Sequence, residues 1–325
     1  MAEFRILIIR LSSMGDVIHT LPAAASLKHS FPHSSLCWIV RERWSPLLHG
    51  NPFVNRILAV ERGVGGLMRV VQSLRRERFD LVVDFQGLIQ SALVAASARS
   101  PRKVGLHRSQ ARESLASLFY STAVLTREPH RVERNLELAA AAGAANLLRV
   151  FPLPEGEPEG DLPAGPFVLA SPFAGWGAKQ WPLEYFGELA RGLDIPLVLN
   201  GPPGSAAELA RSGAYVHTSG IGGLIHATRR ASAVVGLDSG PLHLAAALSK
   251  PGVAIYGPSD PAVHGPYGGS IRVLRAPGAA TSQKRRRRED QSMIAIKPSA
   301  VLAALSEILR HRAPNSPTMS AGFSA

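Results

Sequence analysis

The chain has 325 residues with a hydrophobic share of 46%, which is enough for two domains with cores of their own and excludes disorder as the overall state. Cys37 is the only cysteine, so an intrachain disulfide and a cysteine-based zinc site are excluded, and a reducing cytoplasm fits. The formal net charge of +12 predicts partners that carry negative charge, such as nucleic acid, phosphorylated lipid or a nucleotide-linked substrate.

The N-terminal segment begins with a short apolar run that gives way to polar, Gly-containing sequence, without the apolar core and cleavage site of a signal peptide. No stretch approaches the roughly 18 apolar residues that are needed to span a bilayer. We therefore expect a cytoplasmic protein whose contact with a membrane is peripheral.

Short aliphatic runs alternate with helix-length segments in the first half of the chain. They predict strands at 5–11, 36–40, 56–60, 80–85 and 103–106. This alternation is typical of βαβ units and of a parallel sheet, whose buried strands are continuously apolar. Cys37 falls within the second run, where we expect it to behave as a small buried hydrophobe.

The pattern dissolves near the middle of the chain, where Pro, Gly and acidic residues replace the periodic apolar ones. We interpret residues 152–166 as an interdomain linker. A second series of runs then predicts strands at 167–173, 196–201, 233–240, 252–257 and 271–275, and a closing helix near 298–311.

Two open α/β domains in tandem explain both series. We predict an N-terminal Rossmann-like domain over 1–155 and a C-terminal Rossmann-like domain over 166–312. Residues 313–325, rich in Ser, Pro and Ala, are predicted to be a disordered tail.

Ligands of open α/β sheets bind beyond the carboxyl ends of the strands, so the turns that follow the predicted strands are the candidate sites. The first such turn contains Ser13, Gly15 and Asp16. Gly15 would let the backbone come close to a ligand, and Asp16 could take a proton from a hydroxyl group. Alternatively, Asp16 or Ser13 simply caps the next helix, and the spacing leaves both interpretations open.

The second turn contains Ala174, Gly175 and Lys179 and precedes a predicted helix. Small residues before a helix N-terminus suit a diphosphate, to which Lys179 would add positive charge. The turn is not a Walker A loop, because neither Ser nor Thr follows Lys179. A flexible turn with a solvated lysine is the alternative.

The third turn contains Asp238, Ser239 and Gly240, with His243 one helical turn later. Asp238 can cap the helix and can also offer a carboxylate to a sugar nucleotide, and these roles are compatible. By itself, His243 is more typical of a packed helix residue than of a ligand. No His, Asp and Glu spacing predicts a metal site, so a metal-free, non-hydrolytic reaction is favoured.

The three turns belong to a set of motifs that span nearly the whole chain in one order. These motifs are RLSSMGDVIHTLPA at the start, DFQGLIQSAL at 84–93, QARESLASLFY at 110–120, PFAGWGAKQWP at 172–182, DSGPLHLAAAL at 238–248 and YGPSDP at 256–261. Together they resemble glycosyltransferase family 9, which includes the heptosyltransferases of lipopolysaccharide core synthesis. The first motif combined with D-[ST]-G-x-x-H is a specific signal for this family, whereas either motif alone would be a modest one.

The resemblance implies two Rossmann-like domains of the glycosyltransferase B type, with the acceptor on the N-terminal domain and the donor on the C-terminal one. It implies an inverting, metal-independent reaction without a cofactor, from ADP-L-glycero-D-manno-heptose to a Kdo-lipid A acceptor at the cytoplasmic face of the inner membrane. A family 9 transferase with another nucleotide sugar or acceptor is the alternative. A non-catalytic sugar-nucleotide-binding protein is a further one, although pure binding does not need a base such as Asp16.

The resemblance also assigns roles to individual residues. Asp16 is implied as the general base, and Lys179 as a contact to the phosphates or sugar of the donor. The implied donor-binding residues are Ser13, Gly15, Ala174, Gly175, Asp238, Ser239, Gly240 and His243. The implied acceptor contacts are Arg112, which suits a carboxylate or phosphate, and Gln90, which stands where the family pattern has a lysine.

The basic run from Lys284 to Arg288 supplies five of the twelve net charges. It is interpreted either as a surface that meets lipid A phosphates or the anionic inner-membrane surface, or as a solvated loop. Arg131 and Arg134 are likewise interpreted either as acceptor contacts or as surface charges. Nucleic acid is not an expected partner, because the chain has no recognised binding module and no aromatic residues interleaved with the basic ones.

Overall fold

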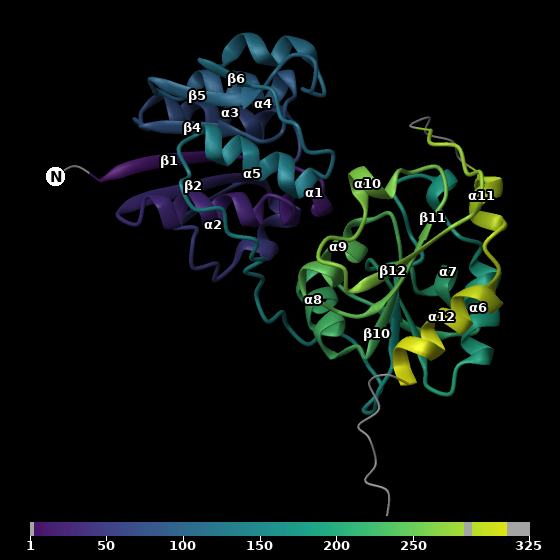
Figure 1. Cartoon of the computed structure of the whole chain (residues 1–325). Helices are drawn as coiled ribbons and strands as arrows, with labels where there is room; N and C mark the ends of the chain where they lie inside the picture. Colours follow the sequence, from purple (N-terminus) through teal and green to yellow (C-terminus); the bar gives the residue numbers. More distant parts are fainter. Residues whose placement is uncertain (1–2, 283–287, 311–325) are drawn as a thin grey trace, which may run out of the picture.

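The computed structural model describes residues 3–282 and 288–310, which form two parallel sheets of six strands each (Figure 1). The strands of the first sheet are β1 (Phe4–Ile9), β2 (Ser34–Arg41), β3 (Arg56–Val60), β4 (Leu81–Asp84), β5 (Arg102–Leu106) and β6 (Thr122–Val124). The strands of the second are β7 (Val168–Ala170), β8 (Leu197–Gly201), β9 (Tyr215–Thr218), β10 (Ala233–Leu237), β11 (Gly252–Tyr256) and β12 (Ile271–Arg275).

Both sheets have the same strand order. The first runs β3-β2-β1-β4-β5-β6 and the second runs β12-β11-β10-β7-β8-β9, so each has its own first strand next to its own fourth. The chain reverses its direction of winding between these two strands, and in such sheets the crevice beyond their carboxyl ends is the usual place for a ligand. The fold thus has two such points, one beyond β1 and β4 and one beyond β7 and β10.

Helices cover both faces of the first sheet. On one face, α3 (Val64–Arg75) and α4 (Ile89–Ser97) pack on the side chains of Leu7 and Ile9 of β1. On the other face, α2 (Leu21–Ser30) and α5 (Arg131–Ala141) pack on Ile6 and Ile8. Successive side chains of a strand point to opposite faces, which explains why β1 is apolar over its buried part, Ile6 to Ile9.

The second sheet is covered in the same way. On one face lie α6 (Leu183–Gly192) and α12 (Pro298–Arg310), and on the other lie α8 (Ile221–Arg230) and α9 (Gly240–Ala247). The core under α8 and α9 is continuous with the core under α2 and α5, so the two sheets share one hydrophobic cluster. The short helices are α1 (Met14–Ile18), α7 (Ala206–Ala210), α10 (Pro261–His264), α11 (Gln291–Ile294), η1 (Glu42–Leu48), η2 (Ser114–Phe119) and η3 (Gly177–Lys179).

The predicted pair of Rossmann-like units is confirmed, including all ten predicted strands and the closing helix, which is α12. The sequence did not predict β6 and β9, which lie at one edge of each sheet. β6 has only three residues and β9 only four, and both include polar side chains, so they lack the apolar run that marks a buried strand.

The segment predicted as a linker, 152–166, contains neither helix nor strand. It is nevertheless held on α8: the guanidinium of Arg229 donates to the carbonyl oxygens of Leu153 and Pro154, and the Glu159 carboxylate accepts from the backbone N–H groups of Gly220 and Gly223. The domain boundaries themselves remain a prediction. The predicted tail at 313–325 and the basic run, except for the exposed Arg288, lie outside the described residues.

Cys37 is buried in β2, as the sequence predicts. Burial raises the pKa of its thiol to about 12, so hardly any thiolate exists at neutral pH. The side chain therefore acts as part of the core under α3 and α4.

Candidate functional site

The turn after β1 holds an ion pair between Arg10 and Asp16. The Arg10 Nη2 atom lies 2.6 Å from Asp16 Oδ1, while its Nη1 atom donates to the backbone carbonyl of Phe85 at the end of β4. The other carboxylate oxygen of Asp16 accepts from the backbone N–H and the hydroxyl of Ser13, at 2.9 Å each. Asp16 therefore does cap its own helix, α1, but its side chain is also 31% exposed and open to a ligand.

Asp16 stays ionised at any ordinary pH. Burial alone would raise the pKa of its carboxyl group, but the charge of Arg10 and the hydrogen bonds from Ser13 outweigh burial and hold that pKa well below its usual value. Arg10 is only 5% exposed, so the carboxylate is also the main compensation for a buried guanidinium. The pair fixes the position of the negative charge at this turn.

The loop after β4 holds the first turn in place from the other side. The Gln86 Oε1 atom accepts from the backbone N–H groups of Leu11 and Ser12, at 3.0 and 3.1 Å. The buried Asp84 carboxylate in turn accepts from Gln86 N–H at 2.8 Å and from the Tyr120 hydroxyl at 2.8 Å. Burial raises the pKa of Asp84, although these bonds oppose the shift. The loop is thus a support for the chain segment that carries Asp16.

In the second sheet, the turns after β7 and β10 meet through an ion pair between Lys179 and Asp238. The Lys179 ammonium also lies 4.0 Å from the centre of the Trp176 ring. Burial alone would raise the pKa of Asp238, but His243 and Lys179 outweigh it and hold that pKa well below its usual value. The lysine is therefore not a freely solvated side chain, which corrects the alternative interpretation of the second turn.

The first and third turns are brought into direct contact, because α1 packs against α9. A Cβ atom at Gly15 would lie 2.4 Å from Cδ2 of His243, and a Cβ atom at Gly240 would lie 2.7 Å from Cβ of Met14. Two helices can approach this closely only where side chains are missing. The glycines that the sequence assigned to a ligand therefore also allow the contact between the two units.

Three histidines line this contact. His19 follows α1, and its ring centre lies 4.3 Å from that of His243 and 5.8 Å from that of His130. His19 is 4% exposed, and within the described part of the chain neither of its ring nitrogens has a hydrogen-bond partner. Burial and then the neighbouring His243 lower the pKa of His19 well below its usual value, and burial also lowers the pKa of His130. His19 and His130 are therefore packed in their neutral form.

Arginines surround the first turn. Arg131, at the start of α5, is partly buried and close enough to Asp16, Arg134 and Arg112 for their charges to affect its pKa, which burial in the first place lowers. Arg134 is also partly buried, and its Nε atom donates to the Thr126 hydroxyl at 3.1 Å. Neither residue is merely a surface charge, so that alternative interpretation was wrong.

The predicted acceptor contacts lie farther out. Arg112 is exposed and follows the loop after β5. Gln90 is exposed near the start of α4, where its Oε1 atom accepts from the Arg41 guanidinium at 3.4 Å. Both residues face solvent on the first unit, on the side where the strands end.

The remaining predicted donor contacts line the second unit. Gly175 is exposed, and a Cβ atom there would meet no heavy atom of the described residues within 4 Å; its neighbour Ala174 is half-buried. Ser239 begins α9, and its hydroxyl has no hydrogen-bond partner in the described structure. The loop and the helix start are thus open to a ligand.

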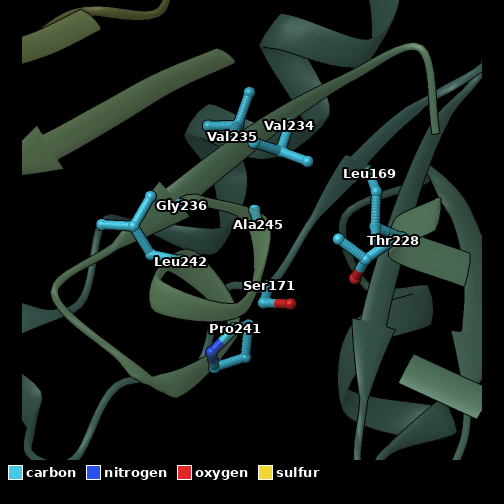
Figure 2. Close-up of a pocket in the computed structure, with 9 residues that line it drawn as sticks. All are labelled: Leu169, Ser171, Thr228, Val234, Val235, Gly236, Pro241, Leu242 and Ala245. Atoms are coloured by element: carbon cyan, nitrogen blue, oxygen red, sulfur yellow. The ribbon is translucent and has the colours of Figure 1, made fainter. Parts of the chain in front are cut away.

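Figure 2 shows a small cavity beneath these turns, between α9 and the strands β7 and β10. Its volume of about 10 Å³ is close to that of one water molecule, and apolar side chains such as Leu169, Val234 and Leu242 form most of its wall. A nucleotide sugar cannot fit there. A ligand of that size must bind above the turns, where Gly175 is exposed and Ser239 is half-buried.

The arrangement offers a fixed carboxylate on one unit and an ammonium group on the other, on either side of a tight helix contact. That set can take a proton from a hydroxyl group and neutralise a departing anion. The sequence alone did not single out Arg10, His19, Gln86 or His130 for this site. Two sequence features could have pointed to some of these residues: the charge of Arg10 at the end of a predicted strand, and the repeated histidines His19 and His130.

Within residues 3–282 and 288–310, no three His, Cys, Asp or Glu side chains are grouped so that they could hold a metal ion. None of the helices seen over the same ranges has the length and apolar character to cross a membrane.

Comparison with known proteins gives a consistent picture. Residues 67–294 match the family described as glycosyltransferase family 9 (heptosyltransferase). Lipopolysaccharide heptosyltransferase 1 of Pseudomonas aeruginosa is 33% identical over 82% of this chain and 82% of its own. The protein of the same name from Escherichia coli K12 is 30% identical over 94% of this chain and 100% of its own.

A solved structure is also similar along the whole chain. Escherichia coli heptosyltransferase WaaC with ADP-2-deoxy-2-fluoro heptose is 30% identical, has a TM-score of 0.73, and covers 94% of this chain and 99% of its own. Its likeness to the two-sheet fold confirms the predicted glycosyltransferase B type.

The contact between α1 and α9 yields a first prediction. Gly15→Ala places a methyl group against the His243 ring, so we expect it to lower the free energy of unfolding by about 1–3 kcal/mol and to reduce activity. Gly65→Ala, in α3, is the matched control: no heavy atom of the described residues lies within 4 Å of the added methyl group, so stability should be unchanged or slightly higher. Urea unfolding measures both. An equal response of the two variants would contradict the proposed tight contact.

The buried histidines yield a second prediction. The unfolded chain protonates His19 near pH 6.5, whereas the folded chain does so only at much lower pH. Stability should therefore fall as pH drops below 6.5, by up to about 1.4 kcal/mol per pH unit for each such histidine. Asp16 and Asp238 affect stability in a lower pH range. Their ionised carboxylates stabilise the fold, and this contribution is lost only as the pH falls below their ordinary pKa near 4.

The test is the slope of unfolding free energy between about pH 5 and 6.5, the range in which histidine titrates. His19→Phe keeps a ring in place without a titrating group, so its slope should be shallower than that of the wild type. His33→Phe, at an exposed position, is the matched control. A wild-type slope in the His19 variant would show that His19 is not held neutral in the fold.

Proposed function

The chain belongs to glycosyltransferase family 9, and on that basis we propose that it transfers heptose from ADP-L-glycero-D-manno-heptose to a Kdo-lipid A acceptor. The enzyme class follows from the family. The donor is supported by the similar structure solved with ADP-2-deoxy-2-fluoro heptose, and the acceptor by the similarity to lipopolysaccharide heptosyltransferase 1. The observation that carries the proposal is that Asp16 and the Lys179–Asp238 pair lie at the ligand-binding points of the two sheets, on either side of the α1–α9 contact.

We further propose that the N-terminal domain, 1–155, binds the acceptor and that the C-terminal domain, 166–312, binds the donor. The exposed Arg112 and the polar Gln90 lie on the first unit, where an anionic acceptor would need them. The accessible backbone at Gly175 and the unpaired hydroxyl of Ser239 lie on the second, where a nucleotide sugar needs close backbone approach.

The donor's diphosphate would bind at the start of α9, near Ser239 and Gly240. Free backbone N–H groups and the positive end of the helix favour a phosphate there. The Lys179 ammonium has three donors, so it can bind a phosphate oxygen while it remains paired with Asp238. Asp238 would thus orient the lysine and accept hydrogen bonds from hydroxyl groups of the sugar, with His243 alongside.

In the proposed inverting step, the acceptor hydroxyl oxygen attacks the anomeric carbon of the heptose from the face opposite to the diphosphate. A carbon–oxygen bond forms to the acceptor, and the bond from the anomeric carbon to the diphosphate oxygen breaks. ADP leaves with that electron pair, and the hydroxyl proton passes to Asp16. Lys179 neutralises the charge that develops on ADP, so no second acid is required.

The low pKa of Asp16 bears on the timing of this proton transfer. A carboxylate held that firmly by Arg10 is too weak a base to deprotonate an alcohol in its ground state. The hydroxyl becomes acidic only as its oxygen bonds to the electron-poor anomeric carbon. Proton transfer to Asp16 would therefore occur late, in a transition state with much positive charge on the sugar.

The proposal places the enzyme at the cytoplasmic face of the inner membrane, where a lipid-linked acceptor and a nucleotide sugar can meet. A direct test is a product assay with ADP-heptose and Kdo-lipid A, in which the acceptor should gain the mass of one heptose. Turnover with a different nucleotide sugar instead would favour another specificity within the family. Tight ADP-heptose binding without any product would favour a binding protein.

The role of Asp16 yields a third prediction. Asp16→Asn keeps the shape of the side chain but removes the proton acceptor, so kcat should fall by about 10²–10⁴-fold while calorimetric affinity for ADP-heptose stays nearly unchanged. Because Arg10 loses its counter-charge, thermal unfolding must be measured alongside. Asp194→Asn, at an exposed position, is the matched control. Near-normal kcat in a folded Asp16→Asn variant would reduce Asp16 to a helix cap.

The role of Lys179 yields a fourth prediction, with a different kinetic signature. Lys179→Ala removes a contact made both to the bound donor and to the departing diphosphate, so KM for ADP-heptose should rise as kcat falls. The exposed Lys297→Ala should change neither parameter. An unchanged KM in the Lys179 variant would mean that the lysine serves only to neutralise Asp238.

A further inference from the structure

Large apolar side chains are exposed on three neighbouring elements of the first unit. Val64 and Met68 on α3 are 78% and 47% exposed, Leu93 on α4 is 51% exposed, and Leu115 and Leu118 on η2 are 59% and 77% exposed. We call these five residues the apolar rim. Soluble surfaces seldom gather so many large apolar groups, and where they do, the surface usually meets another apolar phase.

The elements of the rim form one surface. The helices α3 and α4 cover the same face of the first sheet, and η2 packs against α4. They follow β3, β4 and β5, so the rim begins at the edge of the sheet where ligands bind. Figure 1 shows α3 and α4 at the part of the first unit that is farther from the second sheet. A partner on the rim would therefore leave the second unit free.

The rim is joined to Asp16 through the loop after β4. That loop holds the turn of Asp16 through Gln86, and its Gly87 carbonyl accepts from the backbone N–H of Glu113 at 3.1 Å. The Glu113 carboxylate accepts from Ile89 N–H at 2.6 Å, at the start of α4. Glu113 directly precedes η2, which carries Leu115 and Leu118. The path from the carboxylate of Asp16 to the rim is therefore continuous.

Positive charge flanks the apolar side chains. Arg62 and Arg69 lie beside Val64 and Met68, and both are exposed. Arg43 lies near both Arg62 and Arg41, since burial and then the charges of these two arginines lower its pKa. Glu61 offsets one of these charges through its ion pair with Arg69. The surface is thus apolar with a net positive border.

Arg108 and Arg112 complete this border beside η2, where Glu113 is the opposing charge. Apolar side chains bordered by arginines complement a bilayer surface, because acyl chains take the first and anionic headgroups attract the second. A second copy of this chain would bring the same positive border against itself, which disfavours it as the partner.

We propose that the apolar rim inserts shallowly into an anionic bilayer and holds the acceptor side of the cleft at the level of the lipid headgroups. The inference rests on the proposed function in one respect: the acceptor is carried by a lipid, so the bilayer is the partner within reach. The interaction is peripheral and reversible, because five apolar side chains and a few charges bind far more weakly than a membrane-spanning helix.

The test uses the full-length chain and the double variant Leu115→Ser/Leu118→Ser. Sedimentation with phosphatidylcholine vesicles, with and without phosphatidylglycerol, measures binding. We expect the wild type to bind the anionic vesicles and the double variant to bind them about tenfold more weakly, because two apolar contacts are lost. Val64→Ser/Met68→Ser provides a second, independent variant should the first fail to fold.

The matched control is Val150→Ser/Tyr215→Ser, which removes two exposed apolar side chains outside the rim and should bind like the wild type. Equal vesicle binding by the wild type and both rim variants would overturn the proposal. So would a change in oligomeric state, by analytical ultracentrifugation, that accounts for the whole effect, since the rim would then be a contact between copies.

Measurements of turnover distinguish a failure of the docking role from a failure of the proposed function. With an acceptor stripped of its acyl chains, the rim variant should turn over like the wild type, whereas with acceptor embedded in vesicles its rate should fall together with binding. If neither acceptor is glycosylated by the wild type, the proposed function fails, yet the difference in vesicle binding still supports the rim. A rim variant that loses activity on the stripped acceptor would place these residues in the active site and overturn the docking role.

Discussion

The close packing of α1 against α9 is the constraint on which the rest of the site depends. Gly15 and Gly240 have no side chains at the contact, so the turn with Asp16 and the turn with Asp238 can lie side by side although they belong to different sheets. The continuous core under both sheets supports this placement, because neither half can shift without opening apolar surface to water. The strand order then determines what faces the contact, since each sheet directs its ligand-binding point toward it.

The two ion pairs at this contact differ in rigidity. Arg10 is buried and also donates to a backbone carbonyl, so the guanidinium and the carboxylate of Asp16 are held in one geometry. Lys179 is a point charge on a flexible stem, held by Asp238 and by the ring of Trp176, and it can turn toward a new anion without leaving its pair. The neutral histidines between the pairs add no charge that would compete with either. One half of the site is thus fixed, and the other can adapt to a ligand.

The sequence predicted the fold well and the site in part, and the reason is the range of the interactions. Buried strands and turns rich in glycine are local signals, so ten strands and the three turns could be placed. The edge strands β6 and β9 lack the apolar run that carries this signal. The sequence predicted Arg10 only as the polar end of a strand. Its ion pair with Asp16 forms only in the folded turn, and its other partner, the Phe85 carbonyl, lies 75 residues away. Likewise, Gly15 and His243 meet only across the two sheets, so their contact has no local signature.

The placement of the apolar rim explains why a rigid half and an adaptable half suit a reaction between a lipid-linked and a water-soluble substrate. A lipid-linked acceptor arrives along the membrane and has little freedom to reorient, so the base that meets it must already be in position. In the proposed docking, the loop after β4 would hold Asp16 at a fixed distance from the bilayer, because Gln86 bonds the turn before Asp16 and Gly87 bonds Glu113 next to η2. On this proposal, the nucleotide sugar would reach the second unit from the water, and its binding would require Lys179 to reorient. The two substrates would therefore reach the α1–α9 contact by separate routes, so that binding of one would not block the other.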